Sequence, residues 1–202
     1  MNETRPYHHG NLRQALIDAA LLVVERDGYQ ALSLRDLAQA LGVSRGAPYR
    51  HFPDRDALLR ACAKEGFRLL LEAHREVMKG PASPKEKAYA VCREFLAFSE
   101  TKPGLFMLMY DSGLLEQAKQ EDELGQIVQA IYEGIASTLA EALGDRDETS
   151  LKARLISMWS TIYGFARLRQ GHMLKSYMIG SLTREETEAA IVTAAIGPLP
   201  VE

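Results

Sequence analysis

Apolar residues recur every three or four positions along most of the chain, and few stretches alternate with a period of two. A repeat of three to four residues is typical of amphipathic helices. The first such face is formed by Leu12, Leu16, Ala19 and Val23, and Gly28 is placed to end that helix. We therefore expect an all-α protein.

Capping residues and glycines divide this pattern into about nine helices. Asn11, with Gln14 three residues on, is placed to cap the first helix. Ser83 with Glu86, and Thr183 with Glu186, have the spacing of capping boxes. The expected helices lie near residues 11–27, 34–41, 45–51, 54–79, 84–101, 103–110, 122–143, 147–170 and 183–196.

The helices form two groups. Residues 1–53 make a small N-terminal domain, and residues 54–202 make a larger bundle for dimerisation and ligand binding. The helix near residues 54–79 connects the two, and the clearest linker, Gly80-Pro81-Ala82-Ser83-Pro84, follows it.

Residues 33–52 have the pattern of a helix-turn-helix. Ser33 is placed to cap a short helix whose apolar positions are spaced for one buried face. Gly42 then lies where a left-handed backbone ends that helix, with Val43 placed to pack against it. Ser44 is placed to cap the next helix. Two short helices with a tight turn can seat the second in a DNA major groove.

The second of these helices carries side chains suited to DNA. Arg45 can donate two hydrogen bonds to a guanine edge, while Gly46 and Ala47 allow close approach of the backbone. Tyr49 and His51 can donate to phosphates. Pro48 lacks an N–H, so the sequence predicts a distorted first turn. The alternative is a helical hairpin within a core, which would not need Arg45, Tyr49, Arg50 and His51 on one short helix.

The run from Gly42 to Arg55, preceded by Leu34-Arg35-Asp36-Leu37-Ala38, resembles the signature of the TetR family of repressors. The resemblance implies a three-helix DNA-binding head, a connecting helix, and a bundle that dimerises and holds an inducer. It also implies that residues 44–47 face bases and that Tyr49, His51 and Arg55 contact the DNA backbone. Two departures are Pro48, where many members carry leucine, and Arg55, where lysine is usual. The predicted DNA-binding residues are Ser33, Arg35, Ser44, Arg45, Gly46, Ala47, Pro48, Tyr49, His51 and Arg55.

The C-terminal part offers candidates for an apolar ligand pocket. Residues 159–164 resemble the Trp-x-x-x-His-Gly pattern of one subgroup of these bundles, with Tyr163 in place of histidine. Aromatic residues at helical spacing also form ordinary cores, so packing is the alternative role. The predicted ligand-binding residues are Phe67, Leu71, His74, Phe98, Phe106, Tyr110, Trp159 and Tyr163. The face of Trp159, together with Ala190, Ala194 and Gly197, is expected to form a two-fold symmetric dimer interface.

Charge and cysteine content change this picture little. The net charge is −3, but residues 1–60 carry eight arginines against seven acidic residues. Cys62 and Cys92 are expected to be buried thiols, with a redox-sensing pair as the alternative. His8 and His9 lack a third ligand, so we expect no metal site and no cofactor. Together with Arg5, they are expected to lie on an arm that enters a DNA minor groove.

Other protein classes lack support. No phosphate loop, dinucleotide fingerprint, hydrolase elbow or zinc-protease motif occurs, so we expect no enzyme. No signal peptide is visible, and the longest apolar run, Leu105–Tyr110, is far too short for a membrane span. We therefore expect a cytoplasmic homodimer that represses transcription from a palindromic operator on double-stranded DNA. A small apolar inducer would release it. The alternative is a helix-turn-helix protein-interaction module without a ligand response.

Overall fold

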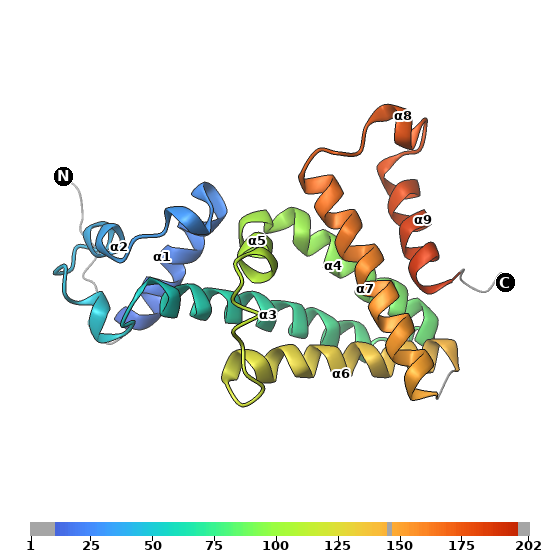
Figure 1. The fold of residues 1–202 in the computed structure, drawn as a ribbon, viewed down its shortest axis with the longest axis horizontal. Helices are drawn as coiled ribbons and strands as arrows, with labels where there is room; N and C mark the ends of the chain where they lie inside the picture. The colour runs from blue at the N-terminus through green and yellow to red at the C-terminus, as the bar shows by residue number, and fades with distance from the viewer. Residues whose placement is uncertain (1–10, 145–146, 198–202) are drawn as a thin grey trace. The chain divides into compact units, whose positions relative to one another are not determined.

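The structure is a computed structural model that describes residues 11–144 and 147–197. Within these ranges all regular elements are helical, which confirms the all-α prediction (Figure 1). The part of the chain described contains nine α-helices and two 3-10 helices, η1 and η2. Their bounds are α1 Leu12–Asp27, η1 Tyr29–Ala31, α2 Leu34–Ala40, η2 Pro48–Arg50, α3 Arg55–Lys79, α4 Pro84–Thr101, α5 Pro103–Asp111, α6 Glu123–Leu143, α7 Glu148–Gln170, α8 Ser176–Ile179 and α9 Arg184–Ile196.

Two elements differ from the sequence prediction. The helix expected over residues 45–51 is a set of turns that ends in the single 3-10 turn η2. The short helix α8 was not expected, because four residues carry no helical repeat and Lys175 at its N-cap makes no side-chain cap. The nine predicted helices and the nine observed α-helices are therefore not the same set.

Most of the predicted helix starts are correct. The Ser33 hydroxyl accepts a hydrogen bond from the backbone N–H three residues on, as expected of an N-cap. Both predicted capping boxes are present, at the starts of α4 and α9. Asn11 occupies the N-cap position of α1, but its side chain caps no amide, so this predicted cap is wrong.

The chain forms two compact units. Unit 1 comprises the chain up to Gly66 together with Gly104–Ala118, and unit 2 comprises Phe67–Pro103 and the chain from Lys119 onward. One boundary therefore lies inside α3 and another at the start of α5. The boundary at residue 53 was predicted between a DNA-binding domain and a ligand-binding bundle, and it stays a prediction.

In unit 1, α1 packs against α2 and both 3-10 helices, and α5 attaches to the end of α1. The two Glu25 carboxylate oxygens accept hydrogen bonds from the backbone N–H groups of Gly104 and Leu105, each at 3.0 Å. A carboxylate at a helix N-terminus satisfies free amides and complements the helix dipole. The core of this unit includes Leu16, Val24, Leu58, Phe106 and Met109.

In unit 2, α4 packs against α6, α7 and α9, and α7 packs against both α6 and α9. The core of this unit includes Leu96, Leu139, Ile162 and Val192, all nearly inaccessible to solvent. Helix α9 is also tied to α4 by Tyr89, whose hydroxyl lies 2.9 Å from the Thr193 hydroxyl and 2.8 Å from the Gly197 carbonyl.

Both cysteines are buried free thiols, Cys62 in unit 1 and Cys92 in unit 2. Burial raises the pKa of each thiol to about 12. Because the thiolate is the reactive form, such thiols react poorly with oxidants at neutral pH. The structure therefore favours the packing role over the redox-sensing pair.

None of the helices in residues 11–144 and 147–197 has the length and apolar character that crossing a bilayer requires.

Candidate nucleic-acid interface

The turn after α2 has a fixed geometry. Gly42 adopts a positive φ of 68°, which a residue without Cβ tolerates easily. The Gly42 N–H donates to the Gln39 carbonyl at 3.1 Å, and the Val43 N–H donates to the Ala38 carbonyl at 3.0 Å. This pair of bonds is the Schellman motif, and it confirms the predicted role of Gly42. The chain therefore leaves α2 in one defined direction.

The next segment, residues 44–52, is built from turns around Pro48. The Ala47 N–H donates to the Ser44 carbonyl at 2.9 Å, so Ser44 begins the segment through its backbone. The predicted cap by Ser44 is wrong, because Ala47 is the N-cap residue of η2 and no side chain caps it. Pro48 has no N–H to continue the helical ladder. After it, the N–H groups of His51 and Phe52 both donate to the Pro48 carbonyl, at 2.9 and 3.0 Å. We call residues 44–52 the recognition segment.

Packing and exposure divide the recognition segment. Pro48 and Phe52 are buried and attach the segment to unit 1. Pro48 is fully buried, so its side chain packs within unit 1, and its DNA contact stays a prediction. The side chains on the other side are exposed: Ser44, Arg45, Gly46, Tyr49, Arg50 and His51. Tyr49 keeps 53% of its surface in solvent, so its side chain is accessible to an external molecule.

Among the described residues, nothing requires a glycine at position 46. A Cβ on Gly46 would meet no atom within 4 Å, and its φ is not positive. Neither packing nor backbone conformation therefore accounts for it. Close approach of an external molecule to the backbone would do so.

The remaining predicted DNA-binding residues lie on neighbouring elements. Arg35 is exposed on α2, and Ser33 and Ala47 are half-buried. Arg55, the first residue of α3, is half-buried and donates to two backbone carbonyls of the loop between α1 and α2. The arm with Arg5, His8 and His9 lies outside the described residues.

Two further cations border this surface and were missed as candidate site residues. Arg50 is exposed within the recognition segment, where its neighbours Tyr49 and His51 already indicated an exposed face. Arg13 on α1 places its guanidinium carbon 5.2 Å from the centre of the Phe52 ring. This cation–π contact joins residues far apart in sequence, so no local pattern could have indicated it.

The predicted ligand-binding residues are divided between the two units. In unit 2, Phe67, His74 and Phe98 are buried, Leu71 and Tyr163 are half-buried, and Trp159 is 50% exposed. In unit 1, the rings of Phe106 and Tyr110 lie 4.9 Å apart. No single cluster within a unit contains all eight. Their role and the subgroup resemblance of residues 159–164 stay predictions.

His74 is the polar member of this set and has an unusual environment. It is 8% exposed, and its Nδ1 has no hydrogen-bond partner among the described residues. On the other edge, a Cβ on Gly134 of α6 would lie 2.9 Å from Nε2, so only a glycine fits against the ring. Burial, and then the positive charge of Arg75, lower the pKa of His74. The ring is therefore neutral at physiological pH, with one nitrogen left unpaired.

A groove of about 900 Å³ lies elsewhere in unit 2, between α4 and the start of α9. Its lining combines alanines of α4 with charged side chains from both helices. Its lining residues are Ala90, Arg93, Glu94, Ala97, Thr183, Arg184, Glu185 and Glu188, none of which was predicted to bind ligand.

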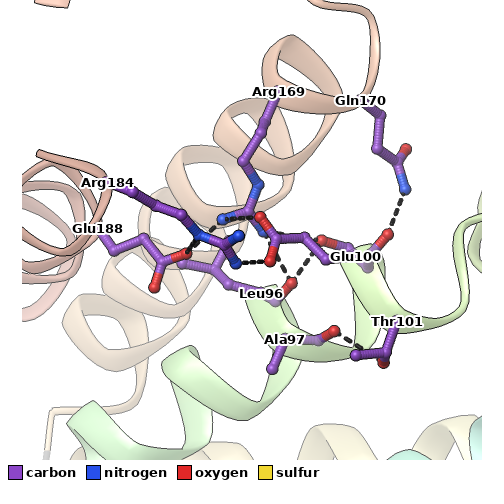
Figure 2. Close-up of polar contacts among 9 residues, drawn as sticks. Leu96, Ala97, Glu100, Thr101, Arg169, Gln170, Arg184 and Glu188 are labelled. Carbon is purple, nitrogen blue, oxygen red and sulfur yellow. Dashed lines mark hydrogen bonds and ion pairs between the residues drawn. The ribbon is translucent and has the colours of Figure 1, made fainter.

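Beside the groove, a cluster of charges ties three helices together (Figure 2). Arg169 of α7 pairs with Glu100 of α4 at 2.7 Å and with Glu188 of α9, and it donates to the Leu96 carbonyl at 2.8 Å. Arg184 pairs with the same two carboxylates. Arg169, Glu100 and Glu188 are mostly shielded from water, whereas Arg184 is exposed. Separating the three shielded charges would be costly, so they hold the ends of α4, α7 and α9 together.

Two family models match the chain. The model described as "Bacterial regulatory proteins, tetR family" matches residues 16–62, which contain α2 and the recognition segment. The model described as "Tetracyclin repressor-like, C-terminal domain" matches residues 88–193, or about half of the chain.

The chain is also similar to individual proteins. The chain is 28% identical over 146 residues to the HTH-type nicotine-responsive transcriptional repressor HdnoR of Paenarthrobacter nicotinovorans, covering 72% of this chain and 75% of that protein. It is 27% identical over 138 residues to the nucleoid occlusion factor SlmA of Vibrio vulnificus, covering 67% of this chain and 68% of that protein. A solved structure of a Rhodococcus sp. RHA1 protein of unknown function matches with a TM-score of 0.78 and 29% identity, covering 95% of this chain and 96% of that chain.

Proposed function

Because the chain belongs to the TetR family of bacterial transcriptional regulators, we propose that it is a homodimeric repressor with a small-molecule inducer. In this proposal the dimer binds a palindromic operator, and a small apolar ligand releases it. Members of this family are regulators of transcription rather than enzymes, and the repressor HdnoR is such a relative.

The observation that carries the DNA-binding proposal is the exposed face of the recognition segment. Arg45, Tyr49 and His51 are exposed on a segment that Pro48 and Phe52 hold in place. A recognition element must combine a fixed backbone with free donors, because base edges are read by hydrogen bonds of defined geometry.

We assign roles along this face by the chemistry of each residue. Residues 44–47 face base edges, with Arg45 donating to a guanine and Gly46 permitting close approach. Tyr49 and His51 donate to phosphates. Ser33 and Arg35, at the start of α2, complete the contact surface.

Exposed apolar side chains in unit 2 support the homodimer. Ile156 and Trp159 on α7 are 62% and 50% exposed, and Ala190 and Ala194 on α9 are exposed as well. Helices α7 and α9 pack against each other, so both lie in one layer of unit 2. A two-fold axis beside this pair would cover the apolar side chains with their own copies.

His74 supports the inducer proposal. An unpaired buried nitrogen costs free energy unless it finds a hydrogen-bond partner, and a ligand with one hydrogen-bonding group on an apolar body would supply that partner. The relative HdnoR is named as nicotine-responsive, which agrees with control by a small organic molecule in a protein of this type.

The experiment is a gel shift. Duplexes that the purified protein enriches from a random DNA pool would be compared with scrambled duplexes at a fixed salt concentration. We expect the enriched duplex to bind at least 1,000-fold more tightly, at the lower end of specific recognition (about 10³–10⁷-fold). The alternative, a protein-interaction module without DNA binding, would enrich no sequence.

A further inference from the structure

Arg55 joins the start of α3 to the loop between α1 and α2. Its Nε–H donates to the Leu32 carbonyl at 3.0 Å, and an Nη2–H donates to the Tyr29 carbonyl at 2.6 Å. The third nitrogen, Nη1, lies 3.5 Å from an Asp56 carboxylate oxygen. Two of the five guanidinium N–H groups therefore donate to backbone carbonyls of unit 1, while 39% of the Arg55 side chain remains exposed.

The two carbonyls need such a partner. Helix η1 is a single 3-10 turn, and Leu32 after it is extended, with φ −64° and ψ 130°. A helix that stops after one turn leaves carbonyl groups without an intrahelical donor. The Tyr29 carbonyl accepts only one backbone bond, a long one of 3.4 Å from the Leu32 N–H. The guanidinium supplies the missing donors, and Leu32 itself is 3% exposed.

The contact links the two ends of the helix-turn-helix. Leu32 directly precedes Ser33, the N-cap of α2, and Arg55 comes three residues after Phe52, the last residue of the recognition segment. The Schellman turn fixes the connection from α2 to the recognition segment. Arg55 therefore closes the loop from the other side and fixes where the recognition segment ends relative to where α2 begins.

Arginine suits this contact better than lysine does. The Nε and Nη2 groups lie on one edge of a planar fork and can serve two carbonyls at once, whereas a lysine ammonium is a single point charge on a flexible stem.

We propose that Arg55 is a positioning residue, which holds the recognition segment in its DNA-reading orientation and does not itself neutralise a phosphate. The proposal rests on the proposed function, because it assumes that the recognition segment reads DNA. It replaces the phosphate contact that the sequence resemblance implies for Arg55.

The test compares Arg55→Lys and Arg55→Ala with the wild type on two probes. One is the duplex that the wild type enriches from a random pool, and the other is a random-sequence duplex. Binding is measured over a range of salt concentrations, at a temperature where melting curves show all proteins to be folded. The matched control is Arg26→Lys, since Arg26 is an exposed arginine at the end of α1 that pairs only with Asp27 in the contacts found.

We expect both Arg55 variants to bind the enriched duplex about tenfold more weakly, which corresponds to about 1.4 kcal/mol. Affinity for the random duplex and the slope of affinity against salt should stay at wild-type values, because no phosphate contact is lost. Arg26→Lys should match the wild type on both probes.

Four results would overturn the proposal. If Arg55→Lys bound normally while Arg55→Ala lost affinity on both probes and about one unit of salt slope, Arg55 would be a phosphate contact. If only the melting temperature fell, the contact would stabilise the fold without orienting the recognition segment. If the wild type bound its enriched duplex specifically and both Arg55 variants bound it equally well, this inference alone would be contradicted. If the wild type enriched no duplex, the proposed function would be contradicted as well.

Discussion

Within the recognition segment, some residues pack in the core and others are exposed and free to bind DNA. Pro48 and Phe52 are buried, while Arg45, Tyr49 and His51 are exposed on the same nine residues. The exposed set makes no contribution to the core, so replacing one of its members should change binding and leave stability almost unchanged.

Arg45→Ala is expected to weaken binding to the enriched duplex by about 1–3 kcal/mol and to relax the preference for one base pair. The physical reason is the loss of two hydrogen bonds to a guanine edge. Affinity for the wild-type duplex and for single-base variants of it would be measured by fluorescence anisotropy. An equal loss on all sequences would show that Arg45 contacts phosphate instead.

His74 predicts a pH dependence of stability. Its pKa is lower in the folded protein than the ordinary value of 6.5, so the unfolded chain takes up a proton more readily. The free energy of unfolding should therefore be unaffected well above pH 6.5 and fall as the pH drops below it. A loss of about 1 kcal/mol would lower the melting temperature by about 2–4 °C.

The comparison is between wild type and His74→Gln, which keeps a polar side chain that does not titrate. The difference between their melting temperatures should change between pH 7.5 and pH 5.5, with the wild type losing more on acidification. His172→Gln serves as the control, because His172 is exposed. Parallel curves for wild type and His74→Gln would contradict this account of His74.

At the scale of elements, the sequence correctly predicted helix caps and turns that depend on neighbouring residues. The N-cap of α2, the two capping boxes and the glycine turn after α2 each depend on residues within five positions of one another. The prediction was wrong for Asn11, where the spacing fits but the side chain makes no cap. Local spacing permits a cap without enforcing it.

Contacts between distant residues could not be predicted. The sequence placed Arg55 correctly at the start of α3, yet its carbonyl partners lie 23 and 26 residues away. The attachment of α5 to α1 spans 79 residues. For the same reason, the sequence could not show that the residues predicted to bind ligand are divided between two units, because that division depends on tertiary packing.

The attachment of α5 predicts that replacing Gly104 destabilises the protein. A Cβ there would lie 2.2 Å from the Val24 carbonyl oxygen and 2.8 Å from the Glu25 Cα, both rigid backbone atoms. Gly104→Ala should therefore destabilise the protein by about 1–3 kcal/mol, as is usual for overpacking, measured by denaturant unfolding. Gly46→Ala is the matched control, because its Cβ would meet nothing, and it should leave stability unchanged while weakening DNA binding. Equal stabilities for the two variants would show that α5 does not pack against α1 in this way.

At the scale of the whole molecule, the proposed homodimer would cover exposed apolar side chains of α7 and α9. Ile156 and Trp159 keep half or more of their surface in solvent in the single chain. In a monomer this apolar surface would stay exposed to solvent, whereas a symmetric dimer would bury it on both subunits.

Ala194→Glu is expected to shift the protein from dimer to monomer without unfolding it. Ala194 is exposed in the single chain, so glutamate fits there, but a dimer would place two carboxylates near the two-fold axis. Sedimentation velocity measures the dimer fraction, and Ala82→Glu in the linker before α4 provides the same substitution away from the interface. An undiminished dimer fraction for Ala194→Glu would place the interface on other elements.

The central claim is that two copies of this chain read a symmetric DNA site with their recognition segments. Sequencing of the duplexes that the purified protein enriches from a random pool tests it most directly. We predict an inverted repeat whose half-site centres are about 34–36 Å apart, or one turn of the double helix. Enrichment of no motif, or of a single motif without two-fold symmetry, would contradict the claim.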